Sequence, residues 1–473
     1  MNWFKILANN KLALLAFLFF FIASIINTWL SIYIFVCAFV IIVLQRSKEE
    51  PAEKKLLIRF FLFGLFLRLL IGGVAHLIAV KYGNGLDIFG DGMAFAINGR
   101  WISAILSGVA NKIPIIYDTA PDWEISMGIL HGSWGQIWPH LHYYQVTLWG
   151  YILGFLYRLF GFRPFIGISI NILLGTLLSL NLYFITRYFL KDKLSKRMKI
   201  TSLLLFNLFP TIFLWSITNM KDMSVIYLLS LFMLFVLKYL ETARFKYMAV
   251  AVVSCAMITS FRYEMLYPLL VLIAAYIYMK WFFSGRAFSR RLSLLILAAA
   301  GLYFLLSKFE ALKRIFFSFA HSQLGHINTE GTVYHILPSY YYSDLANLQV
   351  DLVDFIILFI NGWFHMLFEP LPHRFNKFSL MAYQPINWIW YILLFFSVLG
   401  AVYSLRSKRQ GALGVLIFIF IIGSLIAFAS GNIGTNLRMR DMITPFILVF
   451  SIIGIQGTPI NNKLGRFLHG ENS

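Results

Sequence analysis

Two aspartates one helical turn apart stand just after a long apolar run. The run covers residues 57–80, and the segment LDIFGDGMAFAINGRWI beyond it contains Asp87 and Asp91. Side chains four residues apart share one face of a helix, so a helix here would bring both carboxylates together. A carboxylate whose pKa is raised by burial and neighbours can accept a proton from a substrate hydroxyl. The pair is a candidate general base, and a solvated pair of loop acids is the alternative.

Charged residues recur in three short turns between other apolar runs, which read SITNMKDMSV, TSFRYEMLYP and GNIGTNLRMRDMITP. The basic residues of these turns are Lys221, Arg262, Arg438 and Arg440, and the acidic ones include Asp222 and Glu264. Arginine binds phosphate through a planar fork of donors, and lysine binds it as a point charge. The turns therefore predict a partner that carries an anionic group. A polar turn that only has to remain in water is the alternative.

Arg68 lies near the middle of the run 57–80. A charge at that depth in a membrane is costly, so an intramembrane arginine is a functional-site hypothesis by default. A helix that sits lower in the membrane, or an internal ion pair, would also account for it.

Metal-binding motifs are weak. His131, His140 and His142 are close in sequence, but the His-x-His spacing fits neither two ligands on one helical face nor a known ligand signature. Cys37 and Cys255 both lie inside apolar runs, which excludes a disulfide framework and a thiolate metal site. We therefore expect no metal and no other cofactor, with a divalent metal as an open alternative.

The composition indicates that a membrane-embedded fold positions these residues. Of 473 residues, 60% are hydrophobic and 13% charged, and the mean hydropathy is +0.76. Soluble domains average about 45–50% apolar and about 25% charged residues, so a water-soluble enzyme is excluded. A spanning helix needs about 20 apolar residues, and about twelve runs qualify. They are 12–28, 30–45, 57–80, 164–186, 200–217, 222–240, 247–261, 264–281, 292–307, 387–404, 411–429 and 441–457.

Basic clusters set the expected orientation, because cytoplasmic loops carry an excess of Lys and Arg. The clusters at 46–59, 187–199 and 405–410 are predicted to be cytoplasmic. The further apolar runs 144–160 and 352–368 then cannot cross, and we expect interfacial or re-entrant helices there. Two long outer loops, 81–163 and 309–386, result, and both termini are cytoplasmic. The net charge of +20 then reports orientation and not nucleic-acid binding.

The predicted fold class is an all-α polytopic membrane protein with about twelve transmembrane helices and interfacial helices in the two outer loops. Residues 1–56 would form an N-terminal hairpin and a cytoplasmic linker, 57–457 the main transmembrane domain, and 458–473 a cytoplasmic tail.

The order of these features resembles the GT-C superfamily of membrane glycosyltransferases, especially the bacterial relatives of protein O-mannosyltransferases and the lipid A aminoarabinose transferase. The similarity covers residues 57–457. It lies in the arginine of FLRLL, the aspartates beyond that span, and the segments YILGFLYRLFGFRP, PTIFLWSITNMKD and RMRDMITP.

The resemblance implies an inverting transfer of a sugar from a polyprenyl-phosphate donor to a lipid or glycan acceptor, at the outer face of the bacterial cytoplasmic membrane. It implies Asp91 first and Asp87 second as the general base. Residues that would bind the donor phosphate are Lys221, Arg262, Arg438 and Arg440, and residues that would support them are Arg68, Asp222 and Glu264. Two positions depart from the family pattern, since Phe95 stands where a tyrosine is frequent and Asp91-Gly92 replaces an Asp-Glu pair. The choice between the two aspartates stays open.

Three other functions stay open. A polysaccharide polymerase or ligase with an arginine-led mechanism would give Arg262, Arg438 and Arg440 more weight than Asp91. A transporter or flippase for a lipid-linked sugar would place polar groups at the membrane midplane on broken helices, whereas here only Arg68 is deep. A non-catalytic relative with the same fold is the third.

Overall fold

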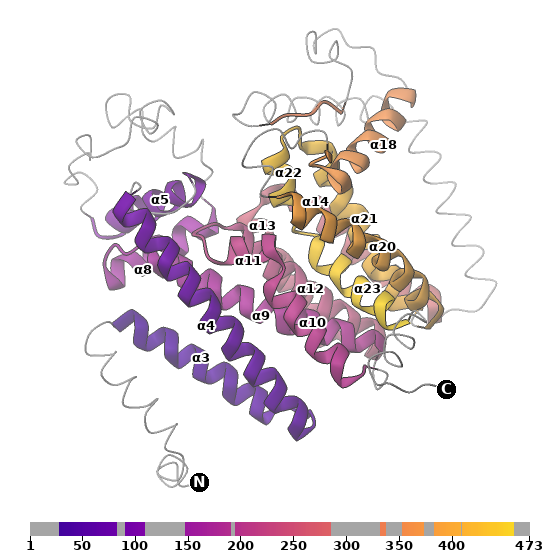
Figure 1. Cartoon of the computed structure of the whole chain (residues 1–473), viewed down its shortest axis with the longest axis horizontal. Helices are drawn as coiled ribbons and strands as arrows, with labels where there is room; N and C mark the ends of the chain where they lie inside the picture. The colour runs from indigo at the N-terminus through magenta and orange to yellow at the C-terminus, as the bar shows by residue number, and fades with distance from the viewer. Residues whose placement is uncertain are drawn as a thin grey trace. The chain divides into compact units, whose positions relative to one another are not determined.

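The computed structural model describes residues 28–82, 90–108, 147–190, 194–284, 332–336, 352–372, 383–407 and 409–457. Within these ranges the regular structure is helical, and the isolated antiparallel bridge between Val333 and Asn432 belongs to no strand (Figure 1). The all-α prediction is therefore confirmed for this part of the chain.

The described helices follow one another with short connections or with gaps where the chain is not described. They are α3 (Thr28–Arg46), α4 (Pro51–Tyr82), α5 (Gly90–Leu106), α8 (Leu148–Phe160), α9 (Phe165–Leu190), α10 (Lys196–Leu208), α11 (Pro210–Ser216), α12 (Asp222–Thr242), α13 (Phe245–Phe261), the 3-10 turn η3 (Tyr263–Met265), α14 (Leu266–Ser284), α18 (Leu352–Phe368), α20 (Gln384–Ser407), α21 (Arg409–Ala429), α22 (Ile433–Arg440) and α23 (Thr444–Gly457).

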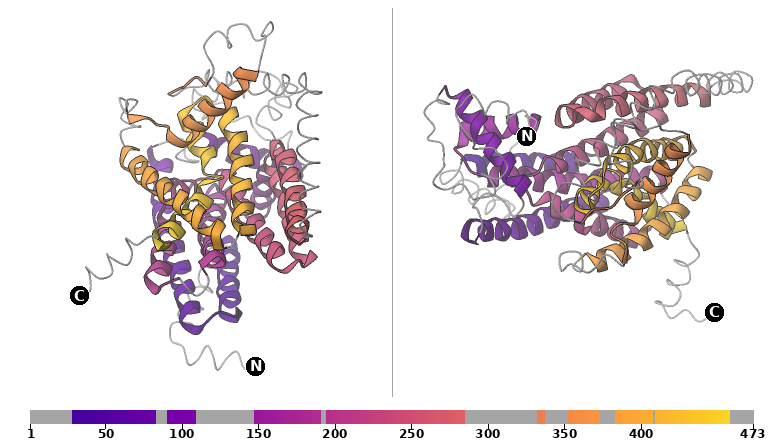
Figure 2. Two further views of the ribbon diagram at one scale, coloured as in Figure 1. Left: turned by 90° about the vertical axis from the view of Figure 1, so that its right-hand side faces the viewer. Right: turned by 90° about the horizontal axis from the view of Figure 1, so that it is seen from above.

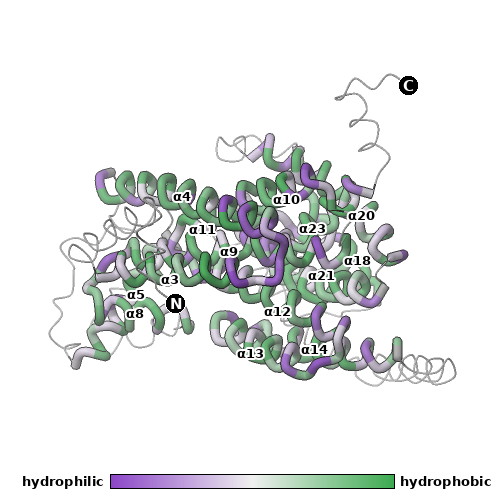
Figure 3. Tube along the Cα trace, turned by 90° about the horizontal axis from the view of Figure 1, so that it is seen from below, coloured by the Kyte–Doolittle hydropathy of each residue, from purple (hydrophilic) through white to green (hydrophobic). Residues whose placement is uncertain are grey.

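Seven helical segments among the described residues are long and apolar enough to cross a membrane, and the number rises to nine if each of two bent pairs counts as one span. The seven are Thr28–Arg46, Pro51–Lys81, Phe165–Leu190, Asp222–Thr242, Tyr263–Phe283, Gln384–Ser407 and Gln410–Ala429. Hydrophobic residues cover most of the length of α4 (Figure 3), and large apolar side chains such as Phe66 and Leu77 point outward from it. A multi-pass membrane protein follows. The predicted run 292–307 and nearly all of 12–28 lie outside the described residues, so the total of about twelve spans and the orientation stay predictions.

One predicted span is broken by a bend, and a second bend directly precedes another predicted span. The run 200–217 forms α10 and α11, which meet at 54°. The break falls at Phe209, directly before Pro210, because a proline has no N–H to donate and disfavours helical geometry in the residue before it. The run 441–457 forms α23 alone, and α22 precedes it at 62° across the turn 441–443. The expectation of a continuous helix was wrong for 200–217, whereas α23 is continuous within the predicted run 441–457 and the second bend lies before it.

The runs 144–160 and 352–368 form short helices. α8 has 13 residues and α18 has 17, which corresponds to rises of about 20 and 25 Å. Both are shorter than a hydrocarbon core of about 30 Å. However, α13, which fills the predicted span 247–261, has 17 residues as well. Length therefore does not separate the two kinds of run, and the place of α8 and α18 at an interface stays a prediction.

Contacts divide the chain into two compact units. Unit 1 comprises residues 1–180 and 212–224, and unit 2 comprises residues 181–211 and 225–473. In unit 1, α3 packs on α4 and α5 packs on α8 (Figure 2). The α5–α8 contact is close, since a Cβ atom on Gly99 would lie 2.6 Å from Leu153 Cβ, and one on Gly154 would lie 2.6 Å from Ile102 Cβ.

The core of unit 2 is α23, whose residues from Thr444 to Gly454 are all buried. α20 packs along α23, and α10 packs on it as well. α21 contacts α14, α18 and α20, and α22 contacts both α18 and α21. An apolar helix buried on every side is expected at the centre of such a bundle.

Candidate functional site

The turn between α11 and α12, residues 217–221, is called the Lys221 turn below. Asn171 of α9 is fully buried, and its Nδ2 donates hydrogen bonds of 2.7 Å to the carbonyl oxygens of both Thr218 and Met220. One amide group therefore fixes both ends of the turn. Carbonyl groups in a membrane-embedded fold must find such internal partners, because no bulk water is available there.

The Lys221 turn contacts the start of α5. Asn219 Nδ2 lies 3.4 Å from the carbonyl oxygen of Gly92, and Trp149 Nε1 of α8 lies 3.4 Å from the carbonyl oxygen of Asn219. Lys221 Nζ lies 5.8 Å from the centre of the Phe95 ring, within the range of a cation–π contact. Half-buried Lys221 is thus beside the first two turns of α5.

Asp91 belongs to that first turn of α5, directly before Gly92, and the structure describes its backbone only. The structure thus brings the backbone of one predicted base and one predicted phosphate-binding residue, Lys221, into the same neighbourhood. Asp222 is the first residue of α12 and is almost completely buried. Asp87 lies outside the described residues.

Arg68 is fully buried in unit 1. Its Nε donates a hydrogen bond of 2.9 Å to Ser216 Oγ, and its Nη1 lies 3.3 Å from the carbonyl oxygen of Gly64. The guanidinium carbon lies 5.1 Å from the centre of the Phe213 ring. Arg68 therefore fixes the end of α11 from which the Lys221 turn starts.

The remaining predicted residues belong to unit 2. Arg262 is buried, and its Nη1 forms an ion pair of 3.3 Å with Glu264 Oε1, whose side chain is 35% exposed. Arg438 is half-buried on α22. The roles assigned to these residues from sequence stay predictions.

Arg440, the last residue of α22, is buried against the C-terminal end of α18. Its Nη1 donates to the carbonyl oxygens of Met366, Leu367 and Glu369 at 3.5, 3.3 and 3.1 Å, and its guanidinium carbon lies 4.5 Å from the centre of the Trp390 ring. The last four carbonyl groups of a helix lack partners within the helix, and cationic groups stabilise that end. The contacts that Arg440 makes here are those of a C-terminal helix cap.

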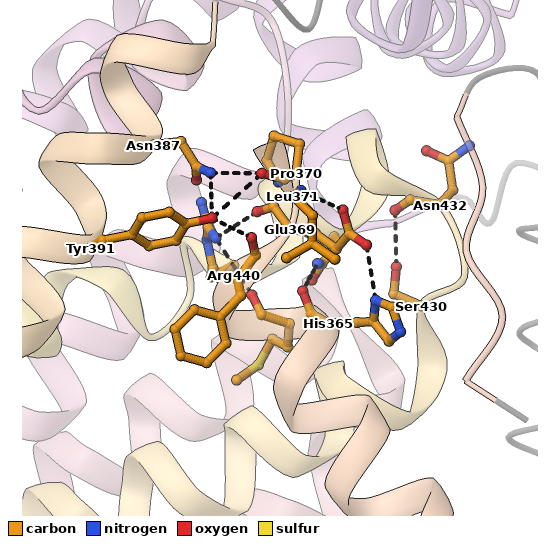
Figure 4. A network of polar contacts seen from close by, with 12 residues as sticks. His365, Glu369, Pro370, Leu371, Asn387, Tyr391, Ser430, Asn432 and Arg440 are labelled. Carbon is orange, nitrogen blue, oxygen red and sulfur yellow. Dashed lines mark hydrogen bonds and ion pairs between the residues drawn. The ribbon is translucent and has the colours of Figure 1, made fainter. Parts of the chain in front are cut away.

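Three residues of α20 complete this arrangement, which we call the α18 cap. Trp390 Nε1 donates to the Leu367 carbonyl at 2.7 Å. Tyr391 Oη donates to the Phe368 carbonyl at 2.6 Å, and Asn387 Nδ2 donates to the Pro370 carbonyl at 2.7 Å (Figure 4). The α18 cap therefore consists of Arg440, Trp390, Tyr391 and Asn387.

A buried carboxylate lies beside Arg440 in the sequence. Asp441 is almost fully buried and accepts a hydrogen bond of 2.8 Å from Thr211 Oγ1. Burial raises the pKa of the nearby Tyr383 hydroxyl; the charge of Asp441 raises it further, and the charge of Arg440 opposes the shift.

A histidine–glutamate pair that sequence reasoning missed lies at the same end of α18. His365 Nδ1 lies 2.9 Å from Glu369 Oε1, and the Glu369 side chain is fully buried. The other oxygen, Oε2, accepts a hydrogen bond of 2.9 Å from the backbone N–H of Leu371. The i, i+4 spacing of the two residues in HMLFEP is a signal that the sequence contained.

Among the described residues, no group of three or more histidine, cysteine, aspartate or glutamate side chains is arranged to hold a metal ion. His131, His140 and His142 lie outside them. Comparison with protein-family models found no matching family, and comparison with curated proteins found no significant relative.

Proposed function

We propose that this protein is a polytopic membrane glycosyltransferase that moves a sugar from a polyprenyl-phosphate donor to a lipid or glycan acceptor of the bacterial envelope. It would act at the outer face of the cytoplasmic membrane, with both termini in the cytoplasm. The observation that carries the proposal is the contact of the Lys221 turn with the first two turns of α5. This contact places a cation, Lys221, beside the backbone of the segment that contains Asp91.

The reaction requires two groups of opposite character. The acceptor oxygen attacks the anomeric carbon and loses its proton to a base, while the bond between that carbon and the lipid phosphate breaks. Asp91 is the first candidate for the base and Asp87 the second. Lys221 would bind the departing phosphate as a point charge. General base catalysis contributes about 10²–10⁴-fold, and charge stabilisation in a site without water usually contributes more.

The unit 2 residues enter the proposal in two ways. Arg262 and Arg438, near ends of α13 and α22, keep the proposed role of binding donor phosphate. Arg440 donates to three backbone carbonyls, which supports a positioning role through α18. Asp222, Glu264 and Arg68 would support the charged groups around them, and no cofactor is needed because the donor is already activated.

The test is sugar transfer by purified protein in lipid nanodiscs, with a panel of polyprenyl-phosphate hexoses as donors and bacterial envelope lipids and glycans as acceptors. Asp91→Asn should lower turnover by about 10²-fold or more while polyprenyl-phosphate binding is retained. Asp354→Asn, on half-exposed Asp354 of α18, is the matched control and should transfer normally. Normal transfer by Asp91→Asn would move the assignment to Asp87 or to the arginine-led polymerase or ligase.

A further inference from the structure

The His365 ring is held by three contacts in unit 2. Besides the hydrogen bond to Glu369, its face stacks on Tyr334 with ring centres 4.6 Å apart and an angle of 15°. Phe364 packs against it edge-on, at 5.7 Å and 82°. These contacts leave the imidazole little freedom to rotate, so its ring atoms have a defined direction.

The groups that hold His365 are themselves held. The backbone N–H of Tyr334 donates to the Gly431 carbonyl at 2.9 Å, and the backbone N–H of Ile433 donates to the Thr332 carbonyl at 3.0 Å. Glu369 directly follows α18, and its backbone carbonyl accepts a hydrogen bond from Arg440 of the α18 cap. Asn436 Nδ2 donates to the His365 carbonyl at 2.9 Å. A side chain is pre-organised for chemistry when the groups that contact it are themselves fixed by further contacts.

The carboxylate of Glu369 decides which ring nitrogen is available. Because it accepts a hydrogen bond from Nδ1–H, the neutral imidazole carries its free electron pair on Nε2. The His365 side chain is 15% exposed, and Nε2 forms no hydrogen bond with any residue in the described ranges. This is the arrangement of a general base that is oriented by a buried carboxylate.

We propose that His365 accepts the proton of the substrate hydroxyl and that Glu369 positions it. The hydroxyl O–H bond breaks as a bond forms between hydrogen and Nε2. The freed electron pair forms the new bond to the anomeric carbon, and the bond to the lipid phosphate breaks with its electron pair on the phosphate oxygen. This inference rests on the proposed glycosyl transfer. One proton leaves the acceptor in each transfer, so His365 is an alternative to Asp91 and experiment separates the two.

The decisive experiment is chemical rescue in the full-length protein. His365→Ala should lower sugar transfer by about 10²-fold or more. Added imidazoles of different basicity should restore part of the activity, with a rate that increases with the pKa of the imidazole. A residue with a merely structural role would not produce that dependence. Exposed His335, from the same segment as Tyr334, supplies the control, and His335→Ala should transfer normally without imidazole.

The positioning role has its own variant. In Glu369→Gln the side-chain oxygen can still accept from Leu371 N–H, and the amide N–H₂ then faces Nδ1. That contact favours the tautomer in which Nε2 is protonated and cannot accept a proton. We expect a loss of transfer similar to that of His365→Ala, with an unchanged thermal unfolding temperature. Unimpaired transfer by folded His365→Ala, or rescue that is independent of imidazole pKa, would overturn the proposal.

A measurement that needs no substrate distinguishes failure of this inference from failure of the proposed function. Diethyl pyrocarbonate modifies unprotonated imidazole nitrogens, and mass spectrometry locates the product. His365 should react in the wild type, Glu369→Gln should slow that reaction several-fold, and exposed His335 should react equally in both proteins as the internal control. If wild-type protein transfers no sugar but His365 reacts in this way, the proposed glycosyl transfer is wrong, whereas the proposal that Glu369 orients His365 as a base is supported. If Glu369→Gln leaves the rate at His365 unchanged, the oriented base is wrong.

Discussion

The Lys221 turn in unit 1 and the α18 cap in unit 2 solve the same problem with different residues. In each, side chains donate hydrogen bonds to backbone carbonyl groups close to the end of a helix. In the Lys221 turn a neutral amide, Asn171, holds two carbonyls, and the lysine rests on an aromatic ring. In the α18 cap a buried arginine contacts three carbonyls, Trp390 shares one of them, and Tyr391 and Asn387 hold two others.

The two arrangements indicate that cations near the ends of apolar helices differ in their contacts. A half-buried one such as Lys221 is the kind that we propose binds the donor phosphate. A buried one such as Arg440 directs its donors to the protein's own backbone. Residue type alone does not separate these uses, whereas burial and donor count do.

The largest effect is expected in the α18 cap. Arg440→Met removes the donor to three carbonyls and leaves buried Asp441 without the charge beside it, which should destabilise the protein by about 3–5 kcal/mol. Unfolding of the purified protein in mixed micelles with increasing denaturing detergent measures this. Arg438→Met, two residues earlier on the same helix and half-buried, should cost no more than about 1 kcal/mol. Equal losses would remove the proposed distinction between the two arginines.

A smaller loss of stability is expected in the Lys221 turn, where one side chain, Asn171, holds two carbonyl groups. Asn171→Leu keeps the volume but leaves the Thr218 and Met220 carbonyls without this donor, so we expect a loss of about 2–3 kcal/mol. Asn181→Leu is the matched control on the same helix, because half-buried Asn181 donates to Ser230 Oγ and not to a backbone carbonyl. The same unfolding assay should give about 1 kcal/mol there. A smaller loss for Asn171→Leu than for the control would contradict the assignment.

The packing that supports α5 comes next. Gly154→Ala inserts a methyl group 2.6 Å from Ile102 Cβ, so α5 and α8 must separate locally, at a cost of about 1–3 kcal/mol. Gly73→Ala, where no atom outside the local backbone of α4 lies within 4 Å of the new carbon, is the control and should be neutral or slightly stabilising. Thermal unfolding and sugar transfer measured together would reveal whether α5 must keep its place for activity.

The smallest effect concerns the ring under Lys221. Phe95→Leu removes the aromatic face and should weaken the contact by about 0.5–1 kcal/mol, while Phe95→Tyr should preserve it. Polyprenyl-phosphate binding in nanodiscs is the readout, because a displaced lysine would bind the phosphate less well. Weaker binding by Phe95→Tyr than by Phe95→Leu would argue that the ring face is unimportant.

The sequence was most informative about the apolar runs, because length and hydropathy alone decide whether a helix can cross a bilayer. It located α4, α9, α12, α20 and α21 to within a few residues. It missed the bend at Phe209, although Pro210 was a readable cause. It also treated the segment GNIGTNLRMRDMITP as a turn, and so missed α22 and the bend between α22 and α23.

The candidate site was less predictable. Charged residues in short turns drew attention to Lys221 and Arg440, but nothing in the sequence shows that Arg440 meets the carbonyls of α18, which come from a segment about seventy residues earlier. Asn171 and Asn387 gave no signal, since an amide within an apolar helix has many possible partners. His365 and Glu369 were within reach of sequence reasoning through their i, i+4 spacing, which is a local property.

The hydrogen bond between Arg68 and Ser216 has an electrostatic consequence. Ser216 is the last residue of α11, and a helix end of this kind carries a partial negative charge of roughly half an elementary charge. A guanidinium placed there is partly balanced by the peptide dipoles of the broken helix. The C-terminal end of α11 at Ser216 therefore forms, inside the buried core of unit 1, a terminus that attracts a cation in the absence of any substrate. Arg68 can then hold its charge at that depth as part of the fold, and its presence is no measure of what the protein binds.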